Sequence, residues 1–221
     1  MANKTIGASA RTLCALAAGL SLFLGFARSA NADVLPITAD LDNRLSDKGM
    51  FSGEIDYAFN AQTGAGILNI TLQNTTVAGG FITGFLFNVQ SDDPGVKVTL
   101  IDGPSKFEDV NRRNGQPFGN AFDAGAGLRG HFKGGGNPRK GIASGETASF
   151  QFRVLASDAS SLTSESFILG PFDHDLIVRF RGPNGGSDIV PALVSPVPGP
   201  SALAALAVAA VISHWRRRSA A

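Results

Sequence analysis

Apolar and polar residues alternate in the run Ala148-Ser149-Phe150-Gln151-Phe152-Arg153-Val154. Because successive side chains of a β-strand point to opposite faces of the sheet, this period of two predicts a strand with one buried face. The same alternation recurs in residues 51–59, 68–72, 81–89, 96–100, 176–180 and 189–194. The last of these runs contains Pro191, which has no N–H to donate, so we expect that strand at a sheet edge.

Short stretches rich in Gly, Asn, Asp and Pro separate these runs, and such residues favour turns. They include residues 62–64, 77–80, 92–95 and 183–186. Within residues 33–194, no long segment has the period of a helix, and only residues 157–166 fit a short turn or helix. Strands that follow one another without helices predict an all-β fold. We expect an antiparallel β-sandwich with jelly-roll-like connectivity over residues 33–194.

Residues 103–145 interrupt this rhythm with many Gly, Asn and basic residues. The segment is long for a structureless loop, so we interpret it as a functional loop or as a segment with one or two short strands near 118–122 and 128–132. Gly125-Ala126-Gly127-Leu128-Arg129-Gly130 matches the Gly-x-Gly-x-x-Gly pattern, but a dinucleotide site requires a helix directly after it. A Gly-rich stretch and Pro138 follow instead, so we interpret the motif as a Gly-rich loop.

The chain has 221 residues and a formal net charge of +1, but its charges are unevenly placed. All 18 acidic residues lie between Asp33 and Asp188, where 13 basic residues give a net charge of −5. A mildly acidic domain has no electrostatic footprint for nucleic acid, so we expect no nucleic-acid partner. The only cysteine is Cys14, so no disulfide can form within residues 33–194.

The N-terminal residues 1–32 have the three parts of a secretory signal peptide. Lys4 and Arg11 form a basic start, an apolar stretch follows to Phe26, and Ala30-Asn31-Ala32 is a small-x-small cleavage site. We predict a signal helix that signal peptidase removes by cutting between Ala32 and Asp33. The chain is therefore expected to be exported.

The C-terminus has the organisation of a membrane anchor. Residues 195–200 form a stiff, proline-rich linker, and residues 201–221 contain an apolar run followed by Trp215 and a basic cluster. The cluster consists of Arg216, Arg217 and Arg218. We predict a transmembrane helix, although the run would reach only about 21 Å across a hydrocarbon core of about 30 Å.

This tail resembles the PEP-CTERM sorting region of bacterial surface proteins. The resemblance rests on the motif Val197, Pro198, Gly199 and Pro200, on the apolar helix and on the arginine cluster, about 25 of the 221 residues. Gly199 stands where the usual motif has Glu. The resemblance implies transient anchoring in the membrane, processing by an exosortase-like enzyme, and release to the cell surface or the extracellular space.

No residue of the middle segment stands out as catalytic, so we expect no enzyme. The segment lacks a Gly-x-Ser-x-Gly nucleophile elbow and a zinc-ligand pattern. Calcium is more plausible than zinc because the available ligands are oxygens, but turn or strand-cap roles are the simpler interpretation of the same acids. The candidate calcium ligands are Asp92, Asp93, Asp173, Asp175 and Asp188, and none follows the Asp-x-Asp-x-Asp-Gly spacing.

Two functions remain open at this point. The first is a structural or adhesive protein of the cell surface or extracellular matrix. The alternative is a secreted carbohydrate- or calcium-binding module, with extracellular polysaccharide as a partner; a hydrolase is the weakest option. The chain has 16 Phe but one Tyr and one Trp, so we expect Phe in the core and no broad sugar-stacking surface.

Overall fold

The computed structural model describes residues 34–43, 49–77, 79–113, 115–119, 121–133, 135–168, 174–182 and 186–195. The predicted signal peptide with its cleavage site, the sorting motif, the transmembrane helix and the arginine cluster lie outside these residues. Within the described residues, no helix is both long enough and apolar enough to cross a bilayer. These terminal assignments therefore stay predictions.

The described chain folds into antiparallel strands and two short 3-10 helices. The strands are β1 (Leu35–Ala39), β2 (Phe51–Asn60), β3 (Ala65–Asn74), β4 (Phe81–Phe87), β5 (Lys97–Asp102), β6 (Phe107–Asp109), β7 (Ala124–Leu128), β8 (Ile142–Ala143), β9 (Thr147–Leu155), β10 (Leu176–Arg181) and β11 (Ser187–Val194). The helices are η1 (Pro138–Lys140) and η2 (Ser164–Phe167). The second falls close to the predicted short helix.

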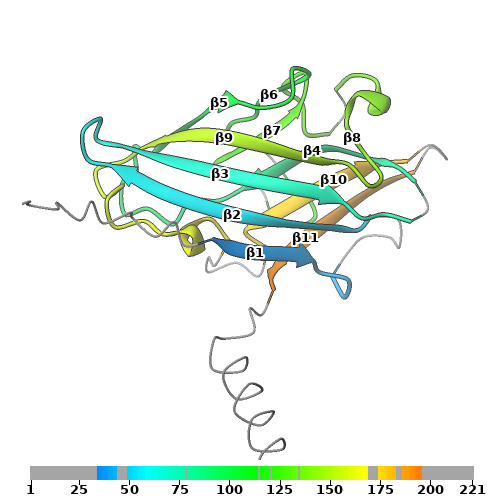
Figure 1. Cartoon of the computed structure of the whole chain (residues 1–221), viewed down its shortest axis with the longest axis horizontal. Helices are drawn as coiled ribbons and strands as arrows, with labels where there is room; N and C mark the ends of the chain where they lie inside the picture. Colours follow the sequence, from blue (N-terminus) through cyan, green and yellow to red (C-terminus); the bar gives the residue numbers. More distant parts are fainter. Residues whose placement is uncertain are drawn as a thin grey trace, which may run out of the picture.

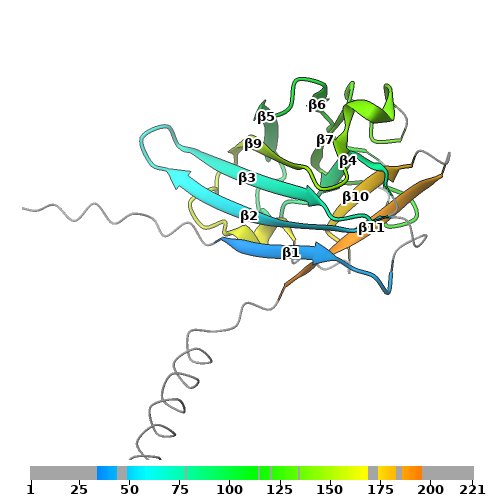
Figure 2. The same cartoon turned by 45° about the vertical axis from the view of Figure 1, so that its right-hand side comes forward.

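The strands form two layers with the order β5-β9-β3-β2-β1 in one and β11-β10-β4-β7-β6 in the other (Figures 1 and 2). Pairing of β1 with β11 joins the layers along one side. Along the other side β5 approaches β6, where the Leu100 N–H donates to Asp109 Oδ1 at 3.0 Å. The predicted all-β antiparallel sandwich is confirmed; jelly-roll-like connectivity stays a prediction.

Phenylalanine dominates the core between the layers, as the composition predicts. Phe85 of β4 packs edge-to-face against Phe150 of β9, with ring centroids 4.8 Å apart. Phe152, also on β9, packs against Phe87 in the same way at 5.2 Å. All four side chains are fully buried. The alternating apolar residues of the predicted strand at 148–154 are therefore the ones that join the two sheets.

The single tyrosine, Tyr57, also points into the core, and its hydroxyl donates to the Ala159 carbonyl oxygen at 2.6 Å. Burial, with a smaller effect of the Asp158 charge, raises the pKa of Tyr57 from 10.0 to about 12. Because the folded protein favours the protonated phenol, Tyr57 stabilises the fold fully below pH 10.0.

We expect this stabilisation to be lost as the pH rises from 10.0 to about 12. Denaturant unfolding should show a fall in the free energy of unfolding over that interval, and Tyr57→Phe should flatten it. Ultraviolet absorbance of tyrosinate reports this residue alone. A tyrosinate titration with an unshifted midpoint in the folded protein would contradict the buried hydroxyl.

The expectation that the last strand lies at a sheet edge is wrong. Pro191 lies in β11, which has β10 on one side and β1 on the other. The reason is local: Pro191 pairs with Ile177, while the next residue, Ala192, pairs with Ala39 of β1. The Pro191 carbonyl still accepts from Asp40 N–H at 2.8 Å. Proline thus occupies the crossover between layers, where β11 changes partners and the missing N–H is tolerated.

The segment 103–145 is a covering layer and not a single loop. It holds β6, β7, η1 and β8, so strands are present, but they coincide with the predicted positions 118–122 and 128–132 only at Leu128, the last residue of β7. Among the described residues of 118–122, Phe122 forms an isolated bridge with Arg113. The segment carries its own small core against the outer face of β4, β10 and β11, made of Leu86, Val110, Phe122, Phe132, Ile177 and Ile189.

The interpretation of the Gly-x-Gly-x-x-Gly motif as a loop is also wrong. Gly125 and Gly127 lie in β7, which pairs with β4, and only Arg129 and Gly130 form the turn after it. A Cβ on Gly125 would lie 2.1 Å from the carbonyl oxygen of Phe85. The glycines therefore allow β7 to approach β4 closely. Glycine-rich sequences are more often turns, so this role is not evident from the composition.

Candidate functional site

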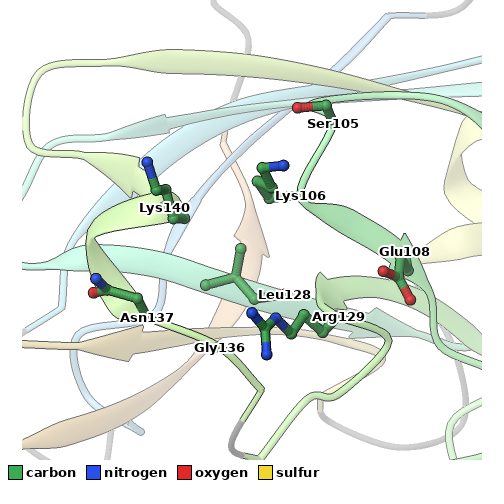
Figure 3. A pocket seen from close by; sticks show the side chains of 8 residues that line it. All are labelled: Ser105, Lys106, Glu108, Leu128, Arg129, Gly136, Asn137 and Lys140. Carbon is green, nitrogen blue, oxygen red and sulfur yellow. The ribbon is translucent and has the colours of Figure 1, made fainter.

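A basic pocket of about 310 Å³ opens beside the β6–β7 hairpin (Figure 3). Three cations, Lys106, Arg129 and Lys140, line it with a single acid, Glu108. Leu128 lies in the centre of the view, between Lys106 and Arg129, and its side chain is buried. The remaining lining residues are Ser105, Gly136 and Asn137. We call this site the basic pocket.

The hairpin fixes two of the cations. Phe107 pairs with Leu128 in the β6–β7 ladder, and the Arg129 N–H donates to the Lys106 carbonyl oxygen at 3.1 Å. The chain then turns within two residues, with Gly130 N–H donating to the Gly127 carbonyl oxygen at 3.1 Å. Lys106 and Arg129 are thus held opposite each other by backbone hydrogen bonds.

The opposite wall is the short helix η1, which carries Lys140. The Asn137 side chain caps this helix by accepting from Arg139 N–H at 3.1 Å, and Lys140 N–H donates to the Asn137 carbonyl oxygen at 3.0 Å. Below the helix, Arg181 Nη1 of β10 donates to the carbonyl oxygens of Gly135 and Gly136, each at 3.1 Å. These contacts tie the wall to the sandwich, so the pocket is largely preformed.

The three cations are available to a ligand. Among the described residues, no ion pair joins Lys106, Arg129 or Lys140 to a carboxylate. Glu108 lies at the right of the view in Figure 3, across the pocket from Lys140 and Asn137. The site therefore carries a net charge of +2 from its four charged lining residues. Clustered lysine and arginine side chains recognise carboxylate, sulfate or phosphate groups.

Positive charge is concentrated in the part of the sequence that supplies the basic pocket. Residues 97–153 hold nine basic and five acidic residues, a net charge of +4. The rest of the segment 33–194 holds four basic and thirteen acidic residues, a net charge of −9. The domain's overall negative charge thus conceals a locally basic region, where a polyanion would be attracted rather than repelled.

The other candidate surface is the outer face of β2, β3 and β9. Its polar side chains form hydrogen bonds with one another across neighbouring strands. Thr71 Oγ1 and Ser149 Oγ lie 3.0 Å apart, and Gln151 Nε2 donates to Asn69 Oδ1 at 3.0 Å. Asn69 in turn donates to Asp56 Oδ2 at 3.3 Å. Among the described residues, the large apolar side chains that are exposed are all aliphatic, and none is aromatic. This face therefore offers no ring on which a sugar could stack.

The described calcium candidates do not converge. Asp93 uses both carboxylate oxygens within its own loop, accepting from Gly95 N–H and Ser157 N–H, each at 2.7 Å. These two hydrogen bonds lower the pKa of Asp93 below its ordinary value of 3.8, and the one from Ser157 has the larger effect. Asp92 lies in the same loop, Asp175 precedes β10, Asp188 lies in β11, and Asp173 is outside the described residues. Within the described part of the chain, no three metal-ligating side chains come together.

The sequence contained a signal for the basic pocket that composition alone does not reveal. Lys106, Arg129 and Lys140 are 34 residues apart from first to last, all within the segment that departs from the strand pattern. Only the pairing of β6 with β7, and the return of η1 beside them, brings the three together. A charge count taken over residues 97–153, rather than over the whole domain, would have pointed to this region.

Comparisons with known proteins add no family. No protein-family model and no curated protein matches the chain. One similar solved structure is a biomass-sensing module from a putative Rsgi-like protein of Clostridium thermocellum, described as resembling a family 3 carbohydrate-binding module (11% identity, TM-score 0.33, 74% of this chain and 98% of that chain). A second is a family 3b carbohydrate-binding module of a Bacteroides cellulosolvens scaffoldin (16% identity, TM-score 0.30, 75% of this chain and 98% of that chain). With TM-scores near 0.3, this likeness assigns neither a ligand nor a family.

Proposed function

We propose that this protein is an exported, non-catalytic binding module that holds an acidic polysaccharide in the basic pocket. The observation that carries the proposal is the convergence of Lys106, Arg129 and Lys140 on one preformed pocket with a single acid. This is the carbohydrate-binding alternative of the sequence analysis, with the ligand now specified as anionic. Calcium is not part of it.

The chemistry of the pocket supports an anionic sugar over a neutral one. Neutral polysaccharides are held chiefly by aromatic stacking, and the described surface presents no exposed ring. A uronate or sulfated sugar offers charged oxygens that Lys and Arg bind with charge-assisted hydrogen bonds. Ser105 and Asn137 supply neutral groups at the rim for sugar hydroxyls. A volume of about 310 Å³ is at the lower end of ligand pockets, which suits one sugar unit of a longer chain.

Export and sorting complete the proposal and rest on the sequence of the two ends. A signal peptide of residues 1–32 and a PEP-CTERM-like tail at residues 195–221 would deliver the module to the cell surface or beyond, where acidic polysaccharides are found. Mass spectrometry of the native protein tests this part. We expect termini near Asp33 and near the motif Val197–Pro200, and a full-length cytoplasmic protein would contradict it.

Isothermal titration calorimetry with oligogalacturonate and with a neutral oligosaccharide of equal length tests the ligand class. We expect binding of the acidic chain, weakened steeply by added salt because the contacts are ionic and solvent-accessible. The neutral chain should bind at least roughly 10-fold more weakly, the loss of about one charge-assisted contact. Equal affinity for the two chains, or binding that salt leaves unchanged, would contradict the proposal.

A further inference from the structure

A second recess lies on the other side of β6 from the basic pocket, along the side where β5 and β6 approach each other. Its volume is about 680 Å³, and it is lined by residues 95–99, Asp109, Asn111, Arg112, Asp123 and Arg153. We call it the seam groove. Glu108 lines the basic pocket and the next residue, Asp109, lines the seam groove. One strand, roughly 5 Å wide, therefore separates the two.

The two carboxylates of the seam groove accept hydrogen bonds from neighbouring parts of the protein, whereas its cations do not pair with them. Asp109 accepts from Leu100 N–H with Oδ1 at 3.0 Å and from the Asn111 side chain with Oδ2 at 3.1 Å. Asp123 accepts from Val89 N–H at 2.9 Å. Among the described residues, Lys97, Arg112 and Arg153 form no ion pair with either carboxylate. The charged residues that line the groove are thus three cations and two hydrogen-bonded carboxylates, which give it a net charge of +1.

Backbone conformation independently marks both sites. Among the described residues, only two that are not glycine have positive φ, Arg112 at 47° and Arg129 at 55°. Each is an arginine, and each lines one of the two recesses. Glycine adopts this conformation without the steric cost that a Cβ brings. Glycine would fit the backbone at both positions, and both positions carry an arginine that lines a recess.

We propose that the seam groove is a second anion-binding site and that the ligand is a polyanionic chain whose charged units engage both recesses at once. This inference rests on the proposed function of the basic pocket and adds the second site and the polymeric nature of the ligand. Two weak sites joined by one ligand bind with the gain of an intramolecular second contact. Affinity then depends on chain length.

Calorimetry with galacturonic acid and with oligogalacturonates of increasing length tests the inference on the domain of residues 33–194. We expect the wild-type affinity to rise by roughly 10- to 100-fold once the oligomer is long enough to reach both sites. The double variant Arg112→Gly/Arg153→Ala should bind galacturonic acid at the basic pocket with the wild-type affinity, lose binding of galacturonic acid in the seam groove, and lose this length dependence. Arg112→Gly alone should unfold at a temperature no lower than wild type, since glycine relieves the strained backbone.

The matched control is Arg113→Ala, which removes the neighbouring exposed arginine that does not line the groove. It should keep the length dependence. An unchanged length dependence in Arg112→Gly/Arg153→Ala would overturn the second site and leave the basic pocket standing. A wild-type protein that binds neither galacturonic acid nor its oligomers would overturn the proposed function and this inference together.

Discussion

Reversing the two lysine charges of the basic pocket, in Lys106→Glu/Lys140→Glu, is expected to weaken oligogalacturonate binding by about 2–3 kcal/mol, roughly 30- to 150-fold. Each lysine supplies an accessible charge-assisted contact, which is worth about 1 kcal/mol after solvent screening. Replacement by Glu adds repulsion to the loss. Because both side chains are exposed, the fold should be unaffected.

A matched control separates local contact from overall charge. Lys133→Glu/Arg139→Glu produces the same change in net charge on exposed residues of the same segment that do not line the basic pocket. We expect this variant to lose less than roughly 5-fold in affinity, chiefly through slower association. Equal losses in the two double variants would show that the protein attracts polyanions diffusely and that the basic pocket is not the site.

Gly125→Ala is expected to destabilise the fold by at least about 3 kcal/mol, which is large against a total stability of about 5–15 kcal/mol. The added Cβ would lie 2.1 Å from the Phe85 carbonyl oxygen and 2.9 Å from Leu86 Cα. Both atoms belong to the backbone of β4, so no side chain can rotate away. The ladder between β4 and β7 would have to separate, and the small outer core over β4 would lose its cover.

Gly64→Ala is the control for this prediction, since nothing lies within 4 Å of its added Cβ and only its φ of 65° opposes the substitution. It should cost about 1–2 kcal/mol. Urea unfolding followed by circular dichroism measures both variants. If Gly125→Ala unfolded at the wild-type midpoint, residues 124–128 would be the Gly-rich loop that the sequence suggested, and the β4–β7 pairing would be wrong.

The sandwich itself could be predicted because its main strands alternate in the simplest way. Ile55, Leu68 and Phe150 lie at the apolar positions that the period of two selects, and all three are fully buried. Strand β4 shows where this rule fails. Phe85 and Leu86 are adjacent yet both fully buried, because one faces the central core and the other faces the small outer core.

A local charge count marks the basic region of the sequence, but two physical reasons keep the geometry of the basic pocket out of reach of sequence analysis. Strand β7 has the sequence Ala-Gly-Ala-Gly-Leu, in which close backbone approach rather than side-chain burial fixes the pairing, so no hydrophobic alternation signals it. The pocket's cations then meet only through this hidden pairing of β6 with β7. The net charge of −5 for residues 33–194 also conceals the net charge of +4 of residues 97–153, so the total charge gives no indication of an anionic ligand.

The most direct test of the account is an amide NMR titration of the domain with a defined oligogalacturonate. Binding in the basic pocket predicts chemical-shift changes that are largest at Arg129, Asn137 and Lys140 and that saturate with the calorimetric affinity. Changes confined to Thr71, Ser149 and Gln151, on the outer face of β3 and β9, would contradict the account and assign binding to the polar sheet face. The absence of changes at saturating ligand would contradict polysaccharide binding altogether.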